Sequence, residues 1–302
     1  MSYRGFFFLA TAALSYGILH VVDKSAVSRG VDPAAYTVMR IVIAMAVLAA
    51  VVMLKGDDRI RSVFRKDNIK DLFIIGVFGS GIGLFFQIKG LSLSSVTNVS
   101  LLLTLVAPMT SFLAFLILKE PISKRFILSS AFMVAGVCSI HLRNTYAPFN
   151  RGDLLVTFAM VGFAYSNIHA RKTMKSMSVT LVTFGRLVFG SLSLGILMPF
   201  LGASLPSLLN APVLVVLGGC LFGVRMAAYY KGIEIEGASV AATFLLFSPA
   251  VAVLSAHLVL GEPITGPIMV GIGLVIVGGF LLTGIRPDNA ACVIANVDRK
   301  GE

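Results

Sequence analysis

The stretch Leu118-Lys119-Glu120-Pro121-Ile122-Ser123 occurs again as Leu260-Gly261-Glu262-Pro263-Ile264-Thr265, 142 residues further along the chain. A long apolar run with one internal proline precedes each copy, and a Gly-rich apolar run, 126–142 or 267–282, follows it. A period of this length is too long for a solenoid unit and is typical of a duplicated half-protein. We therefore expect two related halves, residues 1–142 and 143–302.

The composition indicates a chain that lies in a lipid bilayer. Hydrophobic residues make up 57% of the 302 residues, charged residues make up 13%, and the mean hydropathy is +0.93. A soluble domain carries about 25% charged residues. The three cysteines form neither a C-x-x-C motif nor a zinc-binding spacing, so the sequence predicts no disulfide framework, no metal site and no cofactor.

Apolar runs of about 20 residues predict an all-α membrane protein. The loops between the runs are short, and the longest covers residues 55–71. The first run is expected to stay in the mature protein, because it has a counterpart in the sixth. Ten spans are predicted: Gly5–Val22, Ala34–Leu54, Leu72–Ile88, Thr97–Leu118, Phe126–Leu142, Leu154–Ala170, Val179–Phe200, Val213–Tyr230, Ala238–Leu260 and Ile268–Thr283.

The basic residues predict the orientation of these spans. With the N-terminus in the cytoplasm, 17 of the 25 lysines and arginines fall in cytoplasmic segments and five on the opposite side. This bias favours cytoplasmic termini, and it accounts for the net charge of +11 without a nucleic-acid partner. Because five spans is an odd number, the second half must cross the membrane in the opposite sense. Such a 5+5 inverted repeat is typical of secondary transporters.

These features resemble the EamA-type family of the drug/metabolite transporter superfamily. The resemblance rests on the duplication, on the Glu-Pro turns, on Ser15-Tyr16-Gly17 where the family usually has Trp-Gly, and on basic Lys24 and Arg40. It covers roughly residues 5–284 and implies transport of an amino acid, metabolite, drug or nucleotide-like cofactor. The chain has no tryptophan, which departs from the family pattern, so aromatic stacking on a substrate must use tyrosine or phenylalanine.

Several repeated residues have a structural interpretation. Glu120 and Glu262 each precede a proline and are expected to cap helix N-termini at turns. Pro108 and Pro249 are expected to kink their helices. The pairs Gly79-x3-Gly83 and Gly219-x3-Gly223 are expected to let neighbouring helices approach closely, and they also leave room for a ligand.

One arginine indicates a substrate site. Arg225 lies about 12 residues into the eighth span, near the bilayer midplane, where a cation needs a partner or water. No aspartate or glutamate lies mid-span in this interpretation, so we expect Arg225 to bind the anionic group of an amino-acid-like substrate. Tyr229 lies one turn further along the same face, and Phe86 or Gln87 of the third span are expected opposite.

Six further residues are candidates for gates or for the pathway. Tyr16 and His20 share a helix face, as do their counterparts Tyr165 and His169. Arg40 and Arg186 also correspond between the halves, although Arg40 lies close enough to the outer face to extend into water. The outer gate is therefore expected at Tyr16, His20 and Arg40, and the inner gate at Tyr165, His169 and Arg186. The histidines leave proton coupling open.

Two other function classes remain as alternatives. A lipid-headgroup flippase would need a lateral opening to lipid, which a sequence does not reveal. An intramembrane enzyme would need a nucleophile–base pair or metal ligands, and the chain has no H-E-x-x-H or G-x-S-x-G motif and no aspartate dyad. The leading prediction is a multi-pass transporter of the cytoplasmic (inner) membrane, a monomer or homodimer, that moves a small polar metabolite.

Overall fold

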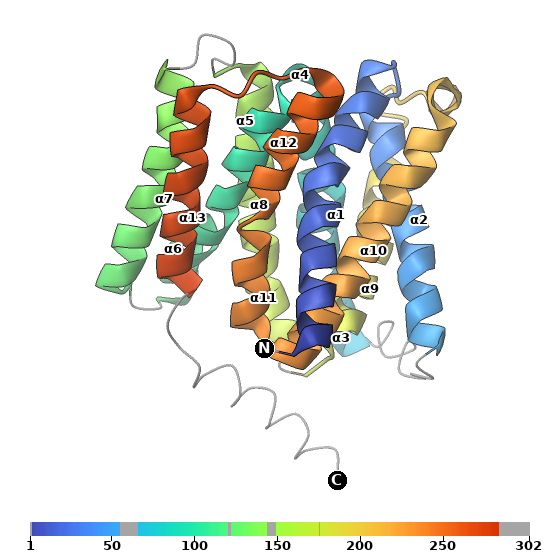
Figure 1. The fold of residues 1–302 in the computed structure, drawn as a ribbon. Coiled ribbons are helices and arrows are strands. Elements are labelled where there is room, and N and C mark those ends of the chain that lie inside the picture. The colour runs from blue at the N-terminus through green and yellow to red at the C-terminus, as the bar shows by residue number, and fades with distance from the viewer. Residues whose placement is uncertain (1, 55–65, 120–121, 144–148, 175, 284–302) are drawn as a thin grey trace.

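The computed structural model describes residues 2–54, 66–119, 122–143, 149–174 and 176–283, and this part of the chain contains helices and connections without any strand (Figure 1). The start of α1 and the end of α13 lie at the same end of the bundle, called here the terminal end. In chain order the elements are α1 Tyr3–Ser28, α2 Pro33–Leu54, α3 Lys66–Ile75, the π-helix η2 Gly76–Gly83, α4 Leu84–Leu93, α5 Val96–Leu102, the 3-10 helix η3 Leu103–Leu105, α6 Val106–Leu118, α7 Lys124–Arg143, α8 Arg151–Thr173, α9 Val179–Leu197, the 3-10 helix η4 Leu205–Asn210, α10 Pro212–Glu236, α11 Ala238–Leu245, α12 Ser248–Leu260 and α13 Gly266–Thr283.

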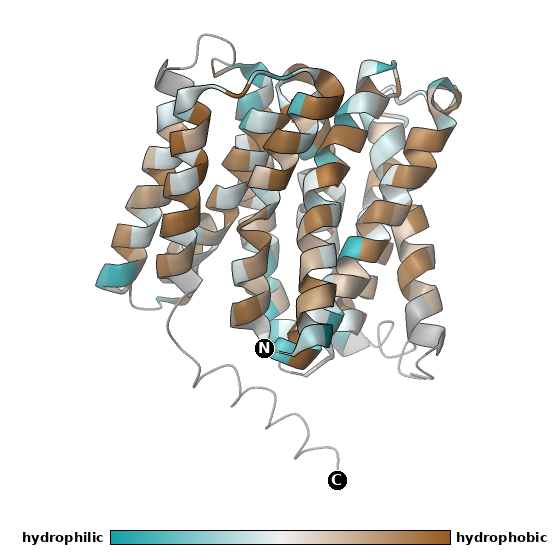
Figure 2. Cartoon of the chain, in the orientation of Figure 1, coloured by the Kyte–Doolittle hydropathy of each residue, from teal (hydrophilic) through white to brown (hydrophobic). Residues whose placement is uncertain are grey.

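The helices have the length and composition of membrane spans. In the described residues seven of them are long and apolar enough to cross a bilayer, and 266–281 forms a shorter apolar helix. Hydrophobic residues run along the helices, and hydrophilic residues gather at the two ends of the bundle (Figure 2). The expected apolar runs overlap helical segments, although the seventh run, Val179–Phe200, continues past the end of α9 at Leu197.

Both mid-span prolines lie where a helical segment is interrupted. Pro108 is in the first turn of α6, directly after η3, and Pro249 is in the first turn of α12, after α11 has ended at Leu245. Proline fits a first turn because the backbone N–H that it lacks would have no partner inside the helix there. The expected kinks are therefore breaks between short helices.

The two halves of the chain pack by exchange of equivalent elements. In the first half α1 packs on α10 and α12, and in the second half α8 packs on η2, α4 and α6. Likewise α2 packs on α10 while α9 packs on η2, and α7 packs on α13. The first helix of each half thus rests on the third and fourth segments of the other half.

Glycine permits the close approach in these contacts, as the sequence predicts. A Cβ atom on Gly219 would lie 2.5 Å from Cβ of Ile43, and one on Gly223 would lie 2.7 Å from Cβ of Val47, so α10 and α2 meet at backbone distance. On the π-helix, a Cβ on Gly76 would lie 2.6 Å from Cβ of Phe189 in α9.

Glu262 is a helix cap, but for a helix of the other half. Its carboxylate accepts hydrogen bonds from the backbone N–H of Val96 and Thr97 and from the Thr97 hydroxyl, so it caps α5 and not the helix that follows it. Glu262 is thus a helix cap as expected, but it caps α5 and not the helix after its own turn. Glu120 lies outside the described residues.

Candidate functional site

A buried ion pair joins α1 to α2 near the end of the bundle opposite the termini. Arg40 Nη1 donates to Asp23 Oδ2 at 2.5 Å, and the Tyr36 hydroxyl donates to Asp23 Oδ1 at 2.6 Å. Both charged side chains are 1% exposed. Removing two charges from water is tolerated only when each has a close partner, and here each has one.

This pair corrects two expectations from the sequence. Arg40 does not extend into water, because it is held against Asp23. The first helix continues to Ser28 and not to Val22, so a carboxylate does lie inside an apolar helix. The sequence prediction ended the span before Asp23 because hydropathy counts a charged residue as exposed to water. In the structure Arg40 neutralises Asp23, so the helix continues through it.

Next to the ion pair, His20 lies against Tyr16 of the same helix. The two ring centroids are 4.8 Å apart, so the predicted common face is confirmed. His20 Nδ1 is 2.8 Å from the Tyr16 carbonyl oxygen, and because a carbonyl only accepts, Nδ1 carries the proton. The buried Nε2 has no hydrogen-bond partner in the described part of the chain.

Arg225 of α10 lies over the ring of Tyr16. Its guanidinium carbon is 3.7 Å from the Tyr16 ring centroid and 5.7 Å from that of Phe222. The ring of Phe222 also lies 4.8 Å from the guanidinium of Arg40. Among the described residues Arg225 has no carboxylate partner, so aromatic faces are what stabilise its charge.

Arg186 of α9 is close to the same place. Its Nε donates to the Ser80 hydroxyl of η2 at 3.0 Å, and Gly79 leaves room for it, since a Cβ there would lie 2.8 Å from Arg186 Nε. One turn before Arg186, the Thr183 hydroxyl is hydrogen-bonded to the hydroxyl of Tyr230 in α10, the helix that carries Arg225. This bond joins the helices of two arginines to which the sequence assigned different roles.

The remaining predicted substrate residues lie on two helices, Tyr229 on α10 with Arg225 and both Phe86 and Gln87 on α4. Tyr229 interacts electrostatically with Arg225, and its ring centroid is 6.0 Å from that of Tyr230. Phe86 has ring contacts with Phe85 and Phe158. Gln87 is buried in α4. Neither Phe86 nor Gln87 makes a polar or ring contact with Arg225 in the part of the chain that the structure describes.

A second Tyr–His pair lies towards the terminal end. Tyr165 and His169 of α8 have ring centroids 4.8 Å apart, again as the spacing predicts. His169 Nδ1 lies 3.9 Å from a carboxylate oxygen of Asp71 in α3, and Lys172 Nζ lies 3.5 Å from the other. Asp71 was not predicted, because it directly precedes the apolar run of the third span.

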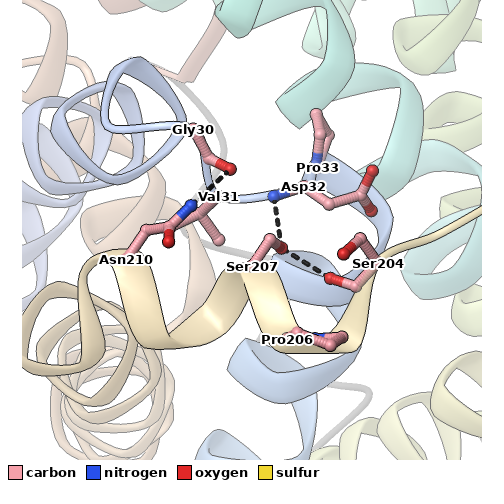
Figure 3. A pocket seen from close by; sticks show the side chains of 8 residues that line it. All are labelled: Gly30, Val31, Asp32, Pro33, Ser204, Pro206, Ser207 and Asn210. Carbon is pink, nitrogen blue, oxygen red and sulfur yellow. Dashed lines mark hydrogen bonds between the residues drawn. The ribbon is translucent and has the colours of Figure 1, made fainter.

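An open pocket of about 550 Å³ lies between the α1–α2 turn and η4 (Figure 3). Its polar groups already bind one another: Asp32 N–H donates to Ser207 Oγ at 2.9 Å, and Asn210 Nδ2 donates to the Gly30 carbonyl at 3.2 Å. The Asp32 carboxylate caps the start of α2 through the N–H groups of Ala34 and Ala35. These bonds tie two loops together, so the residues around Arg225 are the better candidate site.

Comparison with known proteins points in one direction. The EamA-like transporter family matches this sequence twice, at residues 3–142 and 150–284. An uncharacterized transporter of Archaeoglobus fulgidus is 26% identical over 92% of this chain and 98% of its own length. An uncharacterized transporter of Clostridium kluyveri is 25% identical over 92% of each chain. One solved crystal structure of a protein with 18% identity superposes with a TM-score of 0.63 over 94% of this chain and 97% of its own, which supports the fold.

Proposed function

The chain belongs to the EamA-like transporter family, and from this premise we propose that it is a secondary transporter that moves a small anionic or zwitterionic organic metabolite across the cytoplasmic membrane by alternating access. The family and the apolar helices make it a multi-pass membrane protein. The observation that carries the substrate class is the guanidinium of Arg225, which has no carboxylate partner among the described residues and rests on Tyr16.

The proposed architecture has ten transmembrane helices in two inverted five-helix repeats, residues 1–142 and 143–302, with both termini in the cytoplasm. The double match to the family and the exchange of packing partners between the halves support it. A pseudo-two-fold axis in the membrane plane produces such an exchange, because each half then meets the other through equivalent elements. Each half of such a repeat can adopt the conformation that the other half has just left, which provides alternating access.

The substrate site is proposed at Arg225. A cation inside the bilayer costs about 2.5–3.5 kcal/mol even on insertion scales, and cation–π contacts offset roughly 0.5–2 kcal/mol of that. The part of this cost that the aromatic rings do not offset favours binding of a substrate anion. The planar guanidinium of arginine suits a carboxylate, because it can donate two parallel hydrogen bonds. Tyr16 and Tyr229 supply aromatic walls, and Phe86 and Gln87 of the third predicted span remain proposed on the opposite side of the site.

Gates are proposed on either side of this site. Tyr16, His20 and Arg40 form the outer group, and the inner group consists of Tyr165, His169 and Arg186. The outer Tyr–His pair lies beside the Asp23 carboxylate of its own half, and the inner pair lies beside the Asp71 carboxylate of the other half. Histidine is the side chain that titrates nearest to neutral pH, so proton coupling through either group is a variant of the proposal that transport assays at different pH would test.

Reconstituted transport tests this proposal. Purified protein in liposomes is assayed for uptake of a radiolabelled panel of amino acids, carboxylates and uncharged metabolites. We expect uptake of an anionic or zwitterionic solute, with loss of about tenfold or more in Arg225→Lys, because that variant keeps the charge without the fork. Arg125→Lys, at an exposed arginine of α7, is the matched control. Equal transport by Arg225→Ala, or a substrate without an anionic group, contradicts the assignment.

A further inference from the structure

Arg40 and Arg186, which correspond between the two halves, have different hydrogen-bond partners. Arg40 has the carboxylate of Asp23 at 2.5 Å, whereas Arg186 has the neutral hydroxyl of Ser80 at 3.0 Å. When His20 and His169 are aligned, the residue that corresponds to Asp23 is Lys172. The second half therefore has a lysine, and not an acid, at the position equivalent to Asp23.

Arg225 adds a second cation to the same place. It lies over Tyr16 at 3.7 Å. A hydrogen bond between the hydroxyls of Thr183, one turn before Arg186, and Tyr230, five residues beyond Arg225, joins α9 to α10 beside both arginines. Two like charges that share a partly buried site repel each other, so their proximity destabilises the empty protein. Negative charge placed between the two cations would relieve this repulsion.

The described acids nearest in the bundle are already engaged. Asp23 binds Arg40 and Tyr36, and Asp153 accepts from Ser94, Asn98 and the backbone of Asn150. Glu262 caps α5, and Asp71 contacts Lys172. These described acids therefore leave a transported anion as the candidate counter-charge for Arg186 and Arg225.

We propose that Arg186 and Arg225 form a two-cation site and that the transported solute is an organic dianion. This inference rests on the proposed transport function and specifies its substrate class. Arg186 keeps its terminal Nη groups available, because its bond to Ser80 uses Nε alone. The Arg225 guanidinium, lying over an aromatic ring, keeps its N–H edge available. Two carboxylates of one molecule or the two charges of a phosphate monoester satisfy both arginines.

Thermal unfolding of the detergent-purified protein tests the charge requirement. A graded series of dicarboxylates is compared with monocarboxylates of equal length, and ethyl phosphate is compared with the isosteric monoanion ethyl sulfate, at matched ionic strength and slightly alkaline pH. We expect dianions to raise the midpoint temperature of unfolding at concentrations about 10- to 100-fold lower than those of the matched monoanions. This factor is the affinity that a ligand loses when it lacks one hydrogen-bonded ion contact. The carboxylate and phosphate arms identify which dianion binds.

Variants assign the effect to the two arginines. In Arg186→Gln and in Arg225→Gln we expect the preference for dianions over monoanions to disappear, with Arg125→Gln unchanged and size-exclusion profiles unaltered. If monoanions stabilise the parent as well as dianions do, and Arg186→Gln leaves this unchanged while Arg225→Gln abolishes it, the dianion inference is overturned and the proposed transporter of monoanions survives. If no anion of either series stabilises the parent protein, both are overturned.

Discussion

At the scale of single residues, Asp23 shows how a charge can lie inside an apolar helix. It has no exposed surface, and its two carboxylate oxygens are bonded to Arg40 and Tyr36. Because all three groups lie on α1 and α2, the ion pair fixes these helices to each other. Breaking a buried pair by removing one partner costs roughly 3–5 kcal/mol, since it leaves the other charge buried and alone.

Asp23→Asn is therefore expected to destabilise the protein by roughly 3–5 kcal/mol. The measurement is thermal or denaturant unfolding in detergent, with Glu234→Gln as the control. That control removes an acid from the exposed pair with Lys231 and is expected to change stability by less than about 1 kcal/mol. Equal effects of the two substitutions would show that the buried pair does not contribute as described.

The sequence predicted some of these residues and missed others for identifiable reasons. Both Tyr–His contacts follow from a spacing of one helical turn, which local geometry alone determines. The stacking of Arg225 on Tyr16 joins α10 to α1, and spacing along the chain says nothing about which helices meet. Asp23 was missed because hydropathy ends a span at the first charge and does not register its partner.

The contact between His169 and Asp71 leads to a second prediction. If it belongs to the inner gate, His169→Ala and Asp71→Asn should each slow exchange in proteoliposomes by roughly tenfold, the effect of losing one interaction of about 1.4 kcal/mol. His257→Ala is the matched control, because this exposed histidine lies outside both clusters and bonds the Glu262 carbonyl. Unchanged exchange in both inner variants, with normal folding, would remove these residues from the gate.

At the scale of elements, the corner between α4 and α5 is stabilised from two sides. Lys24 Nζ donates to the carbonyls of Leu91, Ser92 and Ser94 at the end of α4, and the Glu262 carboxylate accepts from the first N–H groups of α5. Opposite charges thus satisfy the free ends of two helices. The sequence predicted that Glu262 caps a helix, but the choice of α5 depends on how the halves interlock.

Glu262→Ala is expected to destabilise the protein by roughly 1–2 kcal/mol, the usual cost of removing an N-terminal cap. Glu262→Gln keeps one acceptor oxygen and should cost less. Both effects can be measured by unfolding in detergent, with hydrogen exchange of the Val96 and Thr97 amides as a local readout. A variant that unfolds like the parent and leaves these amides protected would contradict the capping role.

At the scale of the whole molecule, the exchange of packing partners makes each half depend on the other. α1 rests on α10 and α12, and α8 rests on η2, α4 and α6, so neither half buries its helix faces alone. The sequence revealed the duplication through one repeated turn, and the odd number of predicted spans per half implied inversion. It could not show that Arg225 of α10 stacks on Tyr16 of α1, or that α9 and α10 are joined by the Thr183–Tyr230 hydrogen bond, because spacing along the chain does not reveal which helices meet.

The orientation of the bundle gives the last prediction. In a cysteine-free background, Ser204→Cys, in the connection between α9 and α10, is expected to react with a membrane-impermeant maleimide in intact cells. Ser176→Cys, in the connection between α8 and α9, should react only after the membrane is permeabilised. Both serines are exposed, so accessibility to reagent is matched, and the two connections lie at opposite ends of α9. Labelling in the reverse pattern would place both termini outside the cytoplasm. It would also exchange the roles of the outer and inner groups around Arg225.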